Sequence, residues 1–140
     1  MSKHFNQFHS ITKNIIKPPI ITLLQTDGSF HYNKKLSQTA CIIFNDYKLL
    51  TQVKSYSKHK CPMESEWNSV LDGIQFAKKK NITSIYLEND CLGVIRSIVE
   101  NNSHKKFKDY YYHITQEINE FEYIGIRWIS RKYNRADDLF

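Results

Sequence analysis

The sequence predicts one domain of the α/β class, built on a mixed β-sheet flanked by helices. A chain of 140 residues is long enough for one hydrophobic core and too short for two. Three apolar runs joined by short turns fill the first half of the chain. Apolar residues then recur at helical spacing, and strand-like and helix-like segments alternate to the end. This order predicts a five-stranded sheet, with three antiparallel strands followed by two parallel ones.

The first half of the chain predicts the three antiparallel strands. Residues 20–30 form an apolar, β-branched run whose strand ends at the turn residue Gly28. Residues 39–44 form a second run and residues 48–56 a third, with Asn45–Asp46 as the turn between them. These connections are too short for a crossover, so we expect the neighbouring strands to run antiparallel.

The second half predicts four more elements and a short closing helix. Helical spacing extends over residues 63–80, from 92 to about 101, and from 107 to 118. Residues 84–90 and 123–129 read as strands. Asn134 is suited to cap a last helix of about two turns.

The N-terminal segment predicts a flexible basic tail over residues 1–19, ahead of a folded domain over residues 20–140. It carries Lys3, Lys13 and Lys17 and no acid, and Pro18–Pro19 ends any helix early. A transit peptide is the alternative interpretation, but the segment lacks arginine. No hydrophobic pattern ties residues 1–17 to the core, so we expect them to be dispensable.

Charge and cysteine content indicate the class of partner and the compartment. A formal charge of +6 and an isoelectric point near 9.2 favour a polyanionic partner, most simply a nucleic acid, although many basic proteins bind none. Cys41, Cys61 and Cys91 form neither an even disulfide set nor a CxxC pair. No run approaches the roughly 20 apolar residues of a membrane span. We expect an intracellular monomer, in the cytoplasm or nucleus and not secreted, with no membrane partner.

Four acids fall where a strand ends or a helix begins: Asp27, Glu66, Asp90 and Asp137. Each alone has an ordinary explanation, because acids favour helix N-termini and exposed helix positions. Strand ends converge at one edge of an α/β sheet, however, so Asp27 and Asp90 can meet there. Clustered carboxylates repel one another unless cations neutralise them, and hard oxygen ligands suit Mg²⁺ or Mn²⁺. Together the four acids predict a metal site.

Four ordered motifs resemble those of the type 1 ribonuclease H family, in its compact, reverse-transcriptase-like branch. They are TDGSF (26–30), CPMESEWNSVLDGIQFA (61–77), YLENDCLGVIRSI (86–98) and SRKYNRADDL (130–139). The resemblance covers about residues 20–140. It implies a ribonuclease H-like fold and an endonuclease that hydrolyses the RNA strand of RNA–DNA hybrids, leaving 5′-phosphate products.

The resemblance also implies roles for individual residues. Asp27 would bridge two Mg²⁺ ions, for which Mn²⁺ can substitute. Glu66 and Asp90 would complete one ion site, and Asp137 the other. The backbone at Gly28 and Ser29 would approach the RNA, where a missing Cβ permits close contact. Two more positions complete the expected substrate-binding set, Arg131 and Asn134.

The sequence departs from the family pattern at three places. No histidine follows His113, and Arg131–Lys132 stand where a flexible histidine is common. Pro62–Met63 replace an asparagine pair, and a lysine-rich extra helix is missing. We interpret the scattered histidines as surface residues: His31, His59, His104 and His113.

Two other functions fit the same fold. One is a 3′–5′ exonuclease, whose first strand carries Asp-x-Glu, whereas Asp27 is followed here by Gly28–Ser29. The other is a catalytically idle domain that binds nucleic acid or a protein partner. Idle copies typically lose carboxylates, and all four are present here, so the sequence favours the hydrolase.

Overall fold

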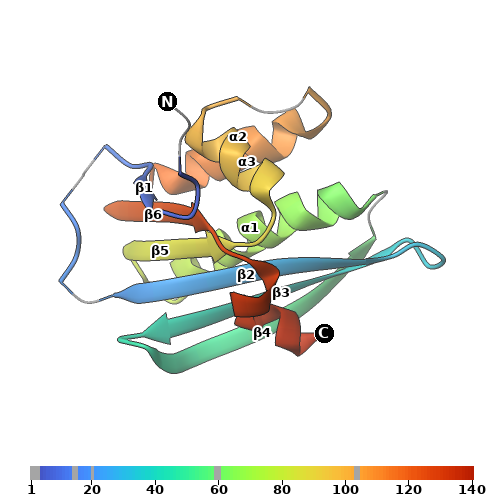
Figure 1. The fold of residues 1–140 in the computed structure, drawn as a ribbon, viewed down its shortest axis with the longest axis horizontal. Helices are drawn as coiled ribbons and strands as arrows, with labels where there is room; N and C mark the ends of the chain where they lie inside the picture. The colour runs from blue at the N-terminus through green and yellow to red at the C-terminus, as the bar shows by residue number, and fades with distance from the viewer. Residues whose placement is uncertain (1–3, 14–15, 20, 59–60, 103–104) are drawn as a thin grey trace.

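The computed structural model describes residues 4–13, 16–19, 21–58, 61–102 and 105–140. A six-stranded sheet in the order β1-β6-β5-β2-β3-β4 forms its centre (Figure 1). The strand β3 (Leu36–Asn45) pairs antiparallel with both of its neighbours, β2 (Thr22–His31) and β4 (Lys48–Lys58). The strands β5 (Ser84–Asn89) and β6 (Tyr123–Trp128) run parallel to β2. The predicted α/β class is confirmed.

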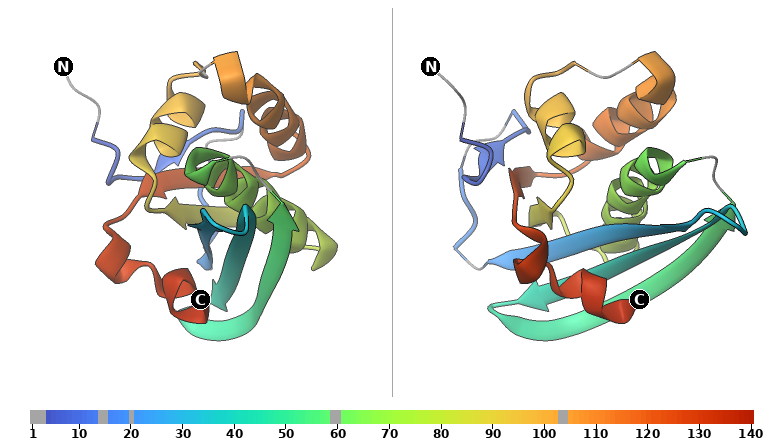
Figure 2. Two further views of the ribbon diagram at one scale, coloured as in Figure 1. Left: turned by 90° about the vertical axis from the view of Figure 1, so that its right-hand side faces the viewer. Right: turned by 45° about the vertical axis from the view of Figure 1, so that its right-hand side comes forward.

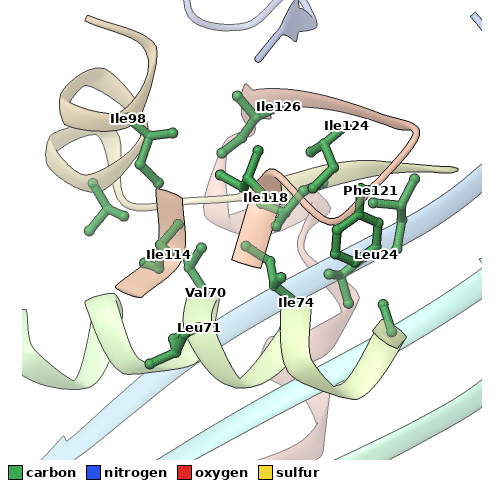
Figure 3. Packing of buried hydrophobic residues seen from close by; sticks show 14 of the residues in the cluster. Leu24, Val70, Leu71, Ile74, Ile98, Ile114, Ile118, Phe121, Ile124 and Ile126 are labelled. Carbon is green, nitrogen blue, oxygen red and sulfur yellow. The ribbon is translucent and has the colours of Figure 1, made fainter. Parts of the chain in front are cut away.

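The helices divide the molecule into layers. On one face of the sheet lie α1 (Pro62–Lys79), α2 (Leu92–Val99) and α3 (Lys108–Ile118), with the 3₁₀ turn η1 (Lys105–Phe107) before α3. The C-terminal 3₁₀ turns η2 (Arg131–Tyr133) and η3 (Arg135–Leu139) lie on the other side (Figure 2). The main core fills the space between the sheet and the three helices (Figure 3).

A smaller apolar cluster lies on the opposite face, where η3 packs on the sheet. Ala136 is fully buried against Ala40, Ile42 and Phe44, and Leu139 packs at the edge of the same cluster. This contact fastens the last residues of the chain to the middle of β3. It therefore fixes the segment that carries Asp137.

The sixth strand comes from the N-terminal segment. β1 (His9–Ser10) pairs antiparallel with β6. The ring of Phe8 packs 4.8 Å from the ring of Tyr86 and 4.3 Å from the guanidinium of Arg127. The sequence predicts five strands and a tail over residues 1–19 outside the domain, whereas the structure places residues 4–13 against the sheet. A strand of two residues is too short to show an alternating pattern, which is why the sequence did not reveal it.

Several element ends differ from the prediction, and two of these differences affect the site. β2 does not stop at Gly28 but continues to His31, because β3 pairs with it along its whole length. The parallel pairing of β2 with β5 does stop, at Thr26 opposite Asn89. The closing helix is the five-residue 3₁₀ turn η3 instead of two α-helical turns, and Asn134 caps it as predicted.

Several side chains lie away from the predicted site. His31 and His113 are exposed, as predicted, while His59 and His104 lie outside the described residues. The three cysteines carry free thiols. Within the described ranges, no helix combines the length and apolar character needed to cross a bilayer.

Candidate active site

The four predicted carboxylates meet where β2 and β5 separate. The parallel ladder ends at Thr26 and Asn89, so the next residue of β2, Asp27, and the residue after β5, Asp90, face a gap between the strands. Glu66 enters from α1 and Asp137 from η3 on the other side of the sheet. One pocket of about 380 Å³ is lined by all four carboxylates together with Gly28, Ser29, Arg131 and Phe140.

A close contact between α1 and β2 brings Glu66 to Asp27. A Cβ atom added to Gly28 would lie 2.6 Å from the carbonyl oxygen of Ser65 and 2.8 Å from its Oγ. The Ser65 hydroxyl donates a hydrogen bond to the carbonyl of Ser29 (3.1 Å). The missing side chain of Gly28 therefore serves the approach of the helix, whereas the resemblance assigned it to the approach of RNA.

The carboxylate cluster fits a divalent cation. One oxygen each from Asp27, Glu66 and Asp90 lies within 4.8 Å of the other two. Oε2 of Glu66 is buried and has no hydrogen-bond partner among the described residues. An unpartnered buried carboxylate oxygen is costly, and a cation held by three carboxylates removes that cost. Oxygen ligands of this kind suit Mg²⁺ or Mn²⁺.

The electrostatics of the metal-free cluster point the same way. Burial raises the pKa of Asp27 to about 9, and the neighbouring charges of Asp90 and Glu66 add to the effect. Burial, followed by the charge of Asp90, raises the pKa of Glu66 to about 8, although the Gly28 amide and the charge of Arg131 oppose this. Without a cation the cluster therefore retains protons at neutral pH, and a bound cation would displace them.

Asn134 fixes the start of η3. It is only 3% exposed, and its Nδ2 donates a hydrogen bond to the carbonyl of Thr26 (2.8 Å). Its Oδ1 accepts a hydrogen bond from the amide of Ala136 (3.1 Å). Both ends of the side chain are thus engaged within the protein. The residue connects the strand that carries Asp27 to the turn that carries Asp137.

Gln25 provides a second connection, which the sequence reasoning missed. Its Oε1 accepts a hydrogen bond from the amide of Arg135 (3.0 Å), and its Nε2 donates to the carbonyl of Tyr133 (3.3 Å). The same Nε2 donates to Oε1 of Glu88 (2.8 Å), and this bond orients the side-chain amide of Gln25. Arg127 pairs with the other oxygen of Glu88 (Nε to Oε2, 2.6 Å). Gln25 therefore holds the backbone on both sides of Asn134.

A signal for this network was present in the sequence. Gln25 and Glu88 are polar residues inside apolar strands, and each stands two positions before an acid of the site. Side chains two apart in a strand point to the same face, so each polar residue lies beside its acid. Buried polar groups at matching positions of two strands indicate a shared hydrogen-bond network.

Arg131 is the basic residue of the pocket. Its side chain is 78% exposed, and its Nη2 donates to Oδ1 of Asp137 at 3.4 Å. Burial raises the pKa values of Glu66 and Asp90, and the positive charge of Arg131 opposes both increases. Phe140, which the sequence reasoning did not assign to the site, is 39% exposed and lines the same pocket.

The fold described above is that of the type 1 ribonucleases H. The reverse transcriptase-like family model matches residues 25–140, and the chain belongs to that family. The family predicted from the four motifs is thereby confirmed. No curated protein matches the sequence.

Solved structures share the fold at low sequence identity. Ribonuclease H1 from the halophilic archaeon Halobacterium salinarum is 15% identical, with a TM-score of 0.79 over 84% of this chain and 92% of that one. The N-terminal ribonuclease H domain of a Mycobacterium tuberculosis protein is 17% identical, with a TM-score of 0.74 over 86% and 90%. LC11 ribonuclease H1, in complex with an RNA/DNA hybrid, is 15% identical, with a TM-score of 0.72 over 84% and 92%.

Proposed function

We propose that this chain is an endonuclease that hydrolyses the RNA strand of RNA–DNA hybrids with the help of two divalent ions, leaving 5′-phosphate products. The observation that carries the proposal is the convergence of four carboxylates in one pocket, where a buried oxygen of Glu66 has no partner in the part of the chain that the structure describes. The fold is shared with ribonucleases H1, one of them solved with an RNA/DNA hybrid, which supports the choice of substrate.

Each carboxylate has a role that follows from its place. Asp27 is central, because one of its carboxylate oxygens lies within 4.8 Å of oxygens of Glu66 and Asp90, and the family resemblance implies that both ions would share it. Glu66 and Asp90 would complete one ion site and Asp137 the other. Bound Mg²⁺ or Mn²⁺ supplies an activated water and neutralises charge on the phosphodiester. Because the carboxylates come from four separate elements, the rigid fold sets their spacing before substrate arrives.

The rest of the pocket would orient the RNA strand. Arg131 is exposed beside the carboxylates, and its guanidinium can donate two hydrogen bonds to a phosphate. Ser29 and the backbone of Gly28 line the pocket and can contact the sugar, whose 2′-hydroxyl distinguishes RNA from DNA. Asn134 is buried and acts indirectly, by holding η3 against β2.

A comparison of matched duplexes tests the proposal. End-labelled RNA–DNA, RNA–RNA and DNA–DNA duplexes of one sequence are incubated with Mg²⁺, Mn²⁺ or EDTA, and the products are resolved on a gel. We expect internal cuts in the RNA of the hybrid only with a divalent ion, and products whose 5′ ends a phosphatase can dephosphorylate. Binding without cleavage would favour the idle domain, and equal cleavage of DNA–DNA would contradict the substrate assignment.

A further inference from the structure

An exposed sheet surface adjoins the carboxylate pocket. Paired residues in neighbouring strands present side chains to the same face, and Ser29, which lines the pocket, pairs with Gln38, which pairs with Tyr56. The next row on that face consists of His31, Leu36 and Lys58. We call these two rows, together with the neighbouring Lys54, the outer hairpin face.

The outer hairpin face lies open beside the C-terminal turn. Asp27 pairs with Ala40, which pairs with Lys54, and this row is where η3 packs: Lys54 donates from Nζ to the carbonyl of Leu139 (3.0 Å). Beyond it, Tyr56 is 58% exposed, and His31 and Lys58 are exposed as well. The long strands β2, β3 and β4 extend past the C-terminus there (Figure 1). The surface is thus continuous with the pocket and largely uncovered among the described elements.

The charge on this part of the chain is predominantly positive. From Gly28 to Lys58 the sequence has a single acid, Asp46. It lies at the turn between β3 and β4, at the end of β3 away from the turn that joins β2 to β3. In the same segment stand five lysines, at positions 34, 35, 48, 54 and 58. The pocket itself concentrates carboxylates. Beyond Arg131 in the pocket itself, a polyanion held there would find the positive charges of Lys54 and Lys58 on the outer hairpin face.

Tyr56 adds an aromatic platform to this charge. The Nζ of Lys54 lies 5.8 Å from the centre of the Tyr56 ring. An exposed aromatic ring beside lysines is the combination that binds unpaired nucleic acid, in which bases stack on rings and lysines meet phosphates. A paired base is already stacked in its duplex and gains little from such a ring. The occupant suggested by the chemistry is a single strand.

We propose that the outer hairpin face binds an unpaired stretch of nucleic acid that continues from the hybrid held at the carboxylate pocket. The proposal rests on the proposed function for the position of the hybrid. Tyr56 on β4 lies two strands away from Ser29 on β2, and Ser29 lies two residues beyond Asp27. By the usual spacings of a β-sheet, the backbones of Asp27 and Tyr56 are roughly 12 Å apart. A nucleic-acid strand that leaves the pocket therefore reaches Tyr56 within a few nucleotides.

Fluorescence anisotropy on the 140-residue chain tests the proposal. The probes are a blunt RNA–DNA hybrid and the same hybrid with a single-stranded extension on either strand at either end. All variants carry Asp27→Asn, so that cleavage does not interfere. We expect one extension to tighten binding by about 5-fold or more, the gain of one base stacked on an aromatic ring. Tyr56→Ala should remove this gain and Tyr56→Trp should keep it.

A matched pair elsewhere on the surface provides the control. On α3, the Nζ of Lys108 lies 5.5 Å from the ring centre of Tyr112, which is 50% exposed. Tyr112→Ala should leave the gain intact. Replacing Lys54 and Lys58 by Gln should lower the slope of log affinity against log salt by about 2, and only for the extended hybrid.

The outcomes separate this proposal from the nuclease itself. If the wild-type chain cleaves hybrids but no extension tightens binding, the outer hairpin face is not a binding surface and the proposed function stands. If extensions tighten binding and Tyr56→Ala removes the gain, while the wild-type chain cleaves no hybrid, the surface stands and the nuclease fails. If the tighter binding of the extended hybrid survives in Tyr56→Ala, the gain comes from charge attraction only and the proposal is overturned. The same holds if heparin abolishes the gain equally in the Asp27→Asn parent and in its Tyr56→Ala variant.

Discussion

Replacing Gly28 by alanine should disturb the fold and the carboxylate cluster together. The added Cβ would lie 2.6 Å from the carbonyl oxygen and 2.8 Å from the carbonyl carbon of Ser65, distances that real Cβ atoms do not tolerate. Two of the three closest atoms are backbone atoms of α1, so no rotamer change relieves the overlap and the helix itself must move. Gly28 does not have a positive φ, so the effect is steric and not conformational.

The cost of this substitution has two parts. Overpacking of this kind lowers the free energy of unfolding by about 1–3 kcal/mol. Glu66 follows Ser65 directly, so a shift of the helix also moves its carboxylate away from Asp27. Changes in the residues that position metal ligands typically cost about 10- to 100-fold in metal affinity, and we expect a loss in that range for Mn²⁺.

Urea denaturation in EDTA and calorimetric titration with Mn²⁺ measure the two parts separately. Gly93→Ala is the matched control, because its Cβ would meet nothing closer than Cε of Met63 at 3.9 Å. That change should raise stability by about 0.5–1 kcal/mol through helix propensity and leave Mn²⁺ affinity unchanged. If Gly28→Ala matches the wild type in both measurements, the contact with Ser65 does not position Glu66 and our reasoning fails.

Three further predictions concern the surroundings of the site. In EDTA, the raised pKa values of Asp27 and Glu66 mean that the native state holds extra protons between about pH 4 and 9. Stability should therefore fall as pH rises through this range, by up to about 1.4 kcal/mol per pH unit for each extra proton, and Asp27→Asn should flatten the profile. Gln25→Leu should cost about 2–4 kcal/mol in urea titrations, because the Tyr133 carbonyl and the Arg135 amide lose their partner, whereas Gln52→Leu on the exposed face of β4 should cost little. Phe8→Ala should lower stability by about 1–3 kcal/mol, since its ring packs on the Arg127 guanidinium and on Tyr86. A flat pH profile, a neutral Gln25→Leu or a neutral Phe8→Ala would each contradict the corresponding contact.

The main elements and the four carboxylates could be predicted because their signals are local. Apolar spacing marks α1 along its own sequence, and short runs rich in apolar residues mark β2 and β5. Asp27 and Asp90 stand at the ends of such runs, so their meeting followed from the rule that parallel strand ends share one edge. Glu66 and Asp137 stand near the starts of predicted helices, and the family motifs then implied the role of each of the four acids.

The contacts that hold the site together could not be predicted in the same way. Gln25 and Glu88 are 63 residues apart in sequence, and Gln25 and Arg135 are 110 apart. A polar residue inside an apolar strand signals that some partner exists, but nothing local in its segment specifies which distant residue that partner is. The close approach of Gly28 to Ser65 depends on how α1 crosses β2, which is a property of the packed layers. β1 is specified by Phe8 packing on distant residues and not by a pattern within its own two positions.

Cleavage of a labelled RNA–DNA hybrid by the wild type and two asparagine variants tests the central claim most directly. Asp27→Asn removes the carboxylate that lies at the centre of the cluster, while Asp138→Asn removes an exposed carboxylate next to Asp137 that does not line the pocket. With Mg²⁺, we expect the wild type and Asp138→Asn to cut the RNA strand at similar rates, Asp27→Asn to be inactive although folded, and EDTA to abolish all cleavage. Cleavage in EDTA, or undiminished cleavage by a folded Asp27→Asn variant, would contradict the assignment of the four carboxylates as a metal-dependent nuclease centre.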